Sequence, residues 1–91
     1  MTHTHQDRDK LLARVRRIAG QVAAVERSLE AEAPCAETLH LVAAVRGAVA
    51  GLMEEILEEH LIEHVARPGL TDAERRAGAD EIATLIKRYG R

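Results

Sequence analysis

Two histidines, His60 and His64, stand four residues apart and have the spacing of a metal-binding pair. On an α-helix, residues i and i+4 lie on the same face, so both imidazoles would project from one side. Such a pair is a standard way to present two nitrogens to one metal ion. Two solvated histidines in a helix rich in Glu would give the same pattern, so the pair alone leaves both interpretations open.

Cys35 is the single cysteine, which excludes an intrachain disulfide and leaves a thiol that is either buried and inert or a ligand. If one straight helix carries Cys35 and His60, a rise of 1.5 Å per residue separates them by about 37 Å. Two copies of that helix packed antiparallel would bring Cys35 of one chain to His60 and His64 of the other. The crossing would fall where small residues cluster, although packing within a monomer is an alternative explanation for them: Gly47, Ala48, Ala50 and Gly51.

Three helices are predicted to position these residues. Apolar residues at heptad spacing predict a first helix over about 7–31. A second helix, over about 34–66, keeps helical spacing and has Pro34 in its first turn. Thr71 and Glu74 form a T-x-x-E capping box, which predicts a third helix to about residue 89. The 91 residues therefore predict one all-α domain, 1–91, with a flexible arm over 1–6.

Composition limits the classes of protein to be considered. Tyr89 is the only aromatic residue, so the core must be aliphatic, and a chain this short favours oligomerisation. No apolar run approaches the roughly 20 residues of a membrane span, and the polar N-terminus lacks a signal peptide. These features predict a cytoplasmic protein without a membrane partner. The net charge of −2 requires any DNA contact to come from a local basic patch.

A basic face is predicted on the first helix. Its members follow the spacing i, i+4, i+7 and i+11, away from the apolar stripe, with Arg16 adding charge nearby. Solvation explains such a face as well as DNA binding does, so composition alone decides nothing. The residues are Lys10, Arg14, Arg17 and Gln21.

Four sequence features together resemble the CsoR/RcnR family of bacterial transcriptional repressors. They are RVRRIAGQV (14–22), Cys35, AAVRGAVAGLM (43–53) and HLIEH (60–64). The resemblance covers nearly the whole chain. It implies three-helix protomers without a helix-turn-helix, assembled as a dimer of dimers, that bind operator DNA through the basic region of the first helix and through Arg46. It also implies repression of metal-efflux or formaldehyde-detoxification genes, with release from DNA when the inducer binds.

The branch of the family depends on a few positions. The copper(I) branch has a second cysteine where this chain has His64, and cuprous copper prefers thiolates. The formaldehyde-responsive branch typically carries proline at position 2 and no histidine at position 64, whereas this chain has Thr2 and His64. The nickel/cobalt branch carries the set found here, His3, Cys35, His60 and His64.

The resemblance therefore predicts a nickel(II)- or cobalt(II)-responsive repressor. His3 on the N-terminal arm would add a ligand to Cys35, His60 and His64, and the match of this set to the nickel/cobalt branch favours these metals over zinc. Zinc or copper binding is a further alternative. His5 and Glu63 are secondary candidates near the site, and His40 is expected to be exposed or structural.

Three other functions remain to be compared with this prediction. One is a formaldehyde-responsive repressor in which Cys35 and the N-terminal amine are bridged. Another is a helical metal-binding module without DNA. Catalysis is not expected, because the sequence supplies no evident substrate pocket or aromatic wall.

Overall fold

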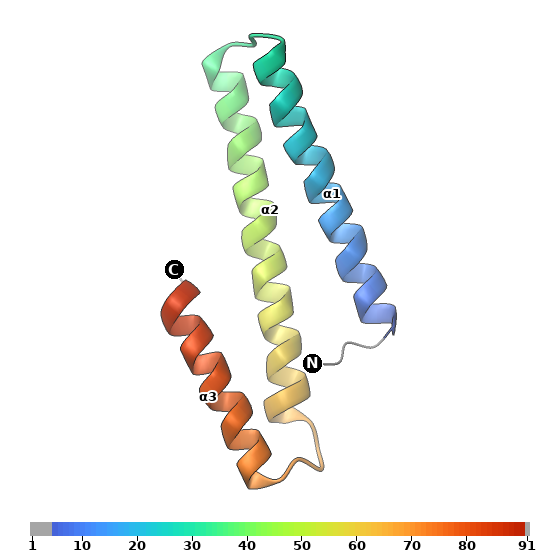
Figure 1. Cartoon of the computed structure of the whole chain (residues 1–91), viewed down its shortest axis with the longest axis vertical. Helices are drawn as coiled ribbons and strands as arrows, with labels where there is room; N and C mark the ends of the chain where they lie inside the picture. The colour runs from blue at the N-terminus through green and yellow to red at the C-terminus, as the bar shows by residue number, and fades with distance from the viewer. Residues whose placement is uncertain (1–4, 91) are drawn as a thin grey trace. The chain divides into compact units, whose positions relative to one another are not determined.

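A computed structural model describes residues 5–90 of the chain (Figure 1). It contains α1 (His5–Glu30), α2 (Cys35–Leu61), the π-helical turn η1 (Ile62–Ala66) and α3 (Asp72–Tyr89), and no strand occurs in this range. The all-α, three-helix fold predicted from the sequence is confirmed. α1 begins two residues before the predicted start, so residues 5 and 6 are helical rather than part of an arm. The second helix changes from α to π geometry after Leu61 instead of remaining α-helical to residue 66.

The described residues divide into two compact units, residues 5–53 and residues 54–90. In the first, α1 and the N-terminal part of α2 form a hairpin (Figure 1). Glu32 closes the connecting turn in the left-handed region, with φ of 54°. The Ser28 and Thr38 hydroxyls are 2.7 Å apart and link the two helices beside the turn. Pro34 stands immediately before α2, one residue outside the predicted start of the helix, where its missing N–H costs no helical hydrogen bond.

In the second unit, α3 packs against η1 and buries Gly78 and Ile82. The connection contains Gly69 at φ of 89°, a conformation that glycine adopts without steric cost. The capping box is present. The Thr71 side chain accepts a hydrogen bond from the Glu74 backbone N–H, and the Thr71 backbone N–H donates to the Glu74 carboxylate at 2.9 Å. These two reciprocal hydrogen bonds fix the residue at which α3 begins.

Thr71→Ala is expected to destabilise the protein by about 1 kcal/mol at neutral pH, because the N-cap acceptor is removed. The backbone N–H and then the side chain of Thr71 lower the pKa of Glu74 below its ordinary value of 4.5. A lowered folded-state pKa stabilises the fold above pH 4.5, and this contribution is lost as the pH falls through the folded-state value. Urea unfolding of the wild type and of Thr71→Ala at pH 7 and pH 3 measures the loss of the cap and the pH-dependent contribution of Glu74.

Thr84→Ala is the matched control, because Thr84 lies within α3 and its hydroxyl donates to the Asp80 carbonyl of the same helix. Thr84→Ala should not destabilise the protein at either pH. Equal losses of stability for the two alanine variants would contradict the role of the cap.

A single chain buries little apolar surface. Leu11 and Ile82 are the buried hydrophobic residues of the described range, while many large aliphatic side chains stay exposed. An exposed apolar surface of this extent is expected to be covered by another molecule. On α1 and α2 the exposed set is Leu12, Val15, Val22, Leu29, Leu39, Val42, Val49, Met53 and Leu61.

The stretch Cys35–Ala66 contains a window of mean hydropathy 1.3 and is long enough to cross a membrane. Arg46 interrupts the apolar residues of this stretch, so it contains no uninterrupted apolar run of that length. A core helix of a soluble protein meets the same criteria, so this is weak evidence for a membrane span.

Candidate metal site and DNA-binding surface

The structure brings the two predicted histidine ligands together. His60 is the penultimate residue of α2 and His64 lies in η1. Their ring centroids are 4.5 Å apart and the ring planes are inclined by 42°. π-Helical turns within α-helices are rare and occur frequently at functional sites. The unusual backbone geometry therefore coincides with the residues whose types point to metal binding.

Both histidines place an imidazole nitrogen in a buried position. Nε2 of His60 and Nε2 of His64 are buried and have no hydrogen-bond partner within the described part of the chain. His60 Nε2 lies 3.3 Å from a Glu81 carboxylate oxygen, within ion-pair distance but without hydrogen-bond geometry. Buried polar atoms almost always make hydrogen bonds in folded proteins, so two buried imidazole nitrogens that make none require an explanation. Two imidazole nitrogens fit two positions in the shell of a borderline metal ion.

Glu81 is a site residue that the sequence did not indicate. It lies on α3, and its side chain is 63% exposed while His60 is buried. The contact is to Nε2, the nitrogen that would face the metal, so Glu81 lies on the donor side of the His60 ring and not behind it. Nothing in the spacing of His60 and Glu81 signals the pairing, because it depends on how α3 packs in the second unit.

Cys35 is the first residue of α2, and its thiol is free and exposed. Among the described residues of one chain, no group of three His, Cys, Asp or Glu side chains is arranged to hold a metal ion. His60 and His64 therefore form only part of a site.

The remaining candidates near the site differ in what the structure shows. His3 lies outside the described residues, and His5 is described only as the first residue of α1. Glu63 pairs with Arg67 at 3.3 Å, so its carboxylate is engaged along the helix. His40 is exposed, as expected.

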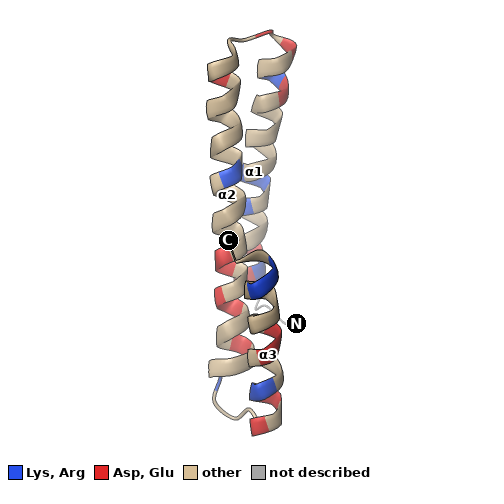
Figure 2. Ribbon diagram, turned by 90° about the vertical axis from the view of Figure 1, so that its left-hand side faces the viewer, with Lys and Arg blue, Asp and Glu red and all other residues tan. Residues whose placement is uncertain are grey.

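The predicted DNA-contacting residues fall into two groups. Lys10, Arg16, Arg17 and Arg46 are exposed, and Figure 2 shows basic residues on α1 and α2. Gln21 is half-buried, and its side-chain oxygen is buried without a hydrogen-bond partner in the described range. Acidic residues follow along the C-terminal part of α2 (Figure 2), a stretch unsuited to phosphate. The acidic residues are Glu54, Glu55, Glu58 and Glu59.

Arg14 is half-buried rather than fully exposed on the basic face. Its guanidinium lies over Gly51 of α2. A Cβ added at Gly51 would collide with Arg14 Nη2 and lie 3.4 Å from Cζ. A Cβ at Gly47, one turn earlier, would meet nothing within 4 Å. Gly51 therefore makes room for the Arg14 side chain within the hairpin.

Gly51→Ala is expected to displace the Arg14 guanidinium without unfolding the hairpin, because the colliding atom ends a flexible side chain. Alanine in a helix is favoured over glycine by about 1 kcal/mol, and displacing Arg14 should offset part of that gain. Gly51→Ala should therefore stabilise the protein more in an Arg14→Ala background than in the wild type. Urea unfolding of the double-mutant cycle measures the difference.

Gly20→Ala is the control for this cycle, because a Cβ at Gly20 meets nothing within 4 Å. Its effect on stability should be the same with and without Arg14. Strict additivity of Gly51→Ala and Arg14→Ala would show that Gly51 does not act through Arg14.

Known proteins resemble this chain over almost its full length. A family model described as metal-sensitive transcriptional repressor matches residues 7–88. An uncharacterised protein from the bioA 5′ region of Serratia marcescens is 48% identical over 98% of both chains. The transcriptional repressor RcnR of Salmonella arizonae is 42% identical over 98% of both chains. Among solved structures, a glutamate-to-histidine variant of the formaldehyde-responsive regulator FrmR from Salmonella enterica serovar Typhimurium shares 44% identity. Its TM-score is 0.88, over 97% of this chain and 99% of the other.

Proposed function

We propose, for a chain that belongs to the metal-sensitive transcriptional repressor family, that nickel(II) or cobalt(II) binding releases it from operator DNA and so controls a metal-efflux gene. The family is one of DNA-binding, oligomeric regulators, and transcriptional repressors are not enzymes. A cytoplasmic location follows from this role. The observation that carries the choice of a metal is the pair of buried imidazole nitrogens on His60 and His64, neither of which makes a hydrogen bond within the described residues.

The complete metal site is proposed to lie between two protomers. Cys35 begins α2 and His60 nearly ends it, so an antiparallel pair of α2 helices would bring Cys35 of one chain to the histidines of the other. The exposed apolar residues of α1 and α2 supply a surface for such a pairing. Two pairs would form a dimer of dimers. His3 would complete the ligand set from the N-terminus.

The donor set supports nickel or cobalt as the inducer. Imidazole nitrogens with a single thiolate suit nickel(II), cobalt(II) and zinc(II), whereas copper(I) prefers more sulfur. With His3, the set would have four protein ligands, a number that zinc also takes, so the preference for nickel or cobalt rests on the match of this set to the nickel/cobalt branch. Zinc and copper are the secondary metal candidates.

Formaldehyde is a second candidate inducer, because Cys35 is an exposed free thiol and FrmR is a formaldehyde-responsive regulator. In that case the Cys35 thiolate would attack the aldehyde carbon, and condensation with the N-terminal amine would lose water and form a methylene bridge. The two histidines would have no role in this chemistry. His64 thus distinguishes the two inducers.

The DNA-binding surface is proposed to consist of the exposed basic residues of α1, together with Arg14, Gln21 and Arg46. Each protomer contributes few positive charges, so several copies must act together and binding should weaken steeply with salt. A metal-binding helical module that does not bind DNA is the alternative of another class. It would show no preference for operator over random DNA.

The test is a fluorescence-anisotropy titration of the protein on DNA from its own upstream region. Nickel, cobalt, zinc, copper(I) and formaldehyde are added separately, and random DNA of equal length serves as the control. Release by nickel or cobalt at the lowest concentrations supports the proposal. Release by formaldehyde alone would show that the protein is a formaldehyde-responsive repressor. Equal affinity for the upstream DNA and for random DNA would contradict a role as a repressor.

A further inference from the structure

We propose that Arg75 and Gly78 of α3 are positioning residues for His64, holding η1 in the π-helical geometry that the metal site uses. The inference rests on the proposed role of His64 as a ligand. Neither residue touches the imidazole donors themselves. Both act through the backbone of η1, one through hydrogen bonds and the other through the absence of a side chain.

Arg75 binds the backbone on both sides of the turn that follows η1. Its guanidinium donates one hydrogen bond to the carbonyl of Val65, the residue after His64, and another at 3.5 Å to the carbonyl of Leu70. Arg75 is half-buried. Carbonyls at the end of a helix have no partner within the helix, so a planar group with several donors is suited to holding them.

Gly78 allows α3 to approach the backbone of His64 closely. Gly78 is buried within α3. A Cβ at this position would collide with the His64 carbonyl oxygen and would lie 2.8 Å from the carbonyl carbon and 3.0 Å from Cβ. The obstruction is backbone rather than the end of a flexible side chain, so alanine would force α3 and η1 apart. Glycine inside a helix is less favourable than alanine, so this close approach has a cost in stability.

The interactions of Arg75 and Gly78 therefore hold η1, the turn that carries His64, against α3. Glu81 of α3 also lies 3.3 Å from His60, so α3 contacts the residues of both candidate ligands. Groups that orient metal ligands typically change metal affinity by about 10- to 100-fold when removed. A shift of His64 relative to His60 would have that effect without removing either donor.

The experiment compares nickel affinity in Arg75→Ala, Arg75→Lys and Gly78→Ala, measured by chelator competition on the full-length protein. Arg75→Ala and Gly78→Ala should weaken nickel binding about 10-fold or more, and Arg75→Lys, which keeps one donor, should fall between Arg75→Ala and wild type. The cobalt(II) ligand-field spectrum should change in both weakened variants. Hydrogen exchange of the amides of 62–66 in the metal-free protein should accelerate in both.

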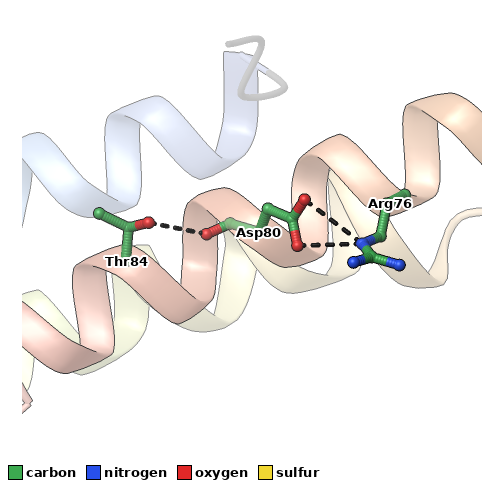
Figure 3. Close-up of polar contacts among 3 residues, drawn as sticks. All are labelled: Arg76, Asp80 and Thr84. Atoms are coloured by element: carbon green, nitrogen blue, oxygen red, sulfur yellow. Dashed lines mark hydrogen bonds and ion pairs between the residues drawn. The ribbon is translucent and has the colours of Figure 1, made fainter.

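Arg76→Ala is the control for the removal of charge, because Arg76 lies next in sequence and its exposed side chain pairs with Asp80 of the same helix, at 3.1 Å (Figure 3). Gly20→Ala is the control for a glycine substitution in open space. Wild-type affinity, spectrum and exchange in both Arg75→Ala and Gly78→Ala would overturn the inference, as would an equal weakening in Arg76→Ala. If the wild type binds no metal, the proposed function fails, whereas the exchange measurement still decides whether α3 holds η1.

Discussion

Replacing His64 by alanine is expected to abolish the release of operator DNA by nickel(II) and cobalt(II) while leaving DNA binding itself intact. The substitution removes one of two adjacent imidazoles, whose ring centroids lie 4.5 Å apart, and leaves the basic residues of α1 unchanged. Loss of a ligand should weaken metal binding at least as much as loss of an orienting group, by about 100-fold or more. A 100-fold change corresponds to about 2.7 kcal/mol of binding free energy.

Chelator competition gives the metal affinity, and anisotropy on operator DNA gives the release. His40→Ala is the matched control, because His40 is an exposed histidine on the same helix. It should bind metal and respond to it as the wild type does. If nickel releases the His64→Ala protein from DNA at the same concentrations that release the wild type, His64 is not a ligand of the inducer metal.

The second large effect is expected from Arg14→Ala and Arg17→Ala, which should weaken operator binding about 10-fold or more near physiological salt while nickel affinity is retained. On the proposed DNA-binding surface each arginine would neutralise phosphate charge, and every copy in the oligomer would carry the substitution, so the reductions in affinity should multiply. The slope of log affinity against log salt should become shallower by about one for each phosphate that the variant no longer neutralises.

Arg76→Ala is a suitable control here as well, since it removes the same charge from an exposed position on α3. It should leave both operator affinity and the salt slope unchanged. Wild-type operator affinity in both Arg14→Ala and Arg17→Ala would show that the basic face of α1 does not contact DNA.

The helices and their order could be predicted because they depend on local signals. Apolar spacing outlined α1 and α2, and the capping box at Thr71 located the start of α3 to within one residue. The π-helical turn η1 could not be predicted from spacing, because the sequence HLIEH is compatible with an uninterrupted α-helix. The interactions of Arg75 and Gly78 with this turn come from a later helix, and tertiary contacts of that kind leave no periodic signal.

The candidate site was predictable in its residue types and in the proximity of His60 and His64, which follows from their spacing. His60, His64 and Cys35 were identified from their chemistry, whereas Glu81 was missed because its contact with His60 depends on the packing of α3. Arg14 was placed on a polar face by spacing, yet its long side chain folds over Gly51 and becomes half-buried. Amphipathic side chains often cover a neighbouring surface in this way, which spacing alone does not reveal.

The proposed function depends most on an inducer site shared between two protomers, and complementation tests this directly. Cys35→Ala and His64→Ala proteins are prepared separately, unfolded together, refolded as a mixture, and titrated with nickel. Each variant alone should bind nickel weakly, whereas mixed dimers should regain one tight site in two, formed by the intact Cys35 of one chain and the intact histidines of the other. A mixture that binds no more tightly than its two components would contradict a shared site.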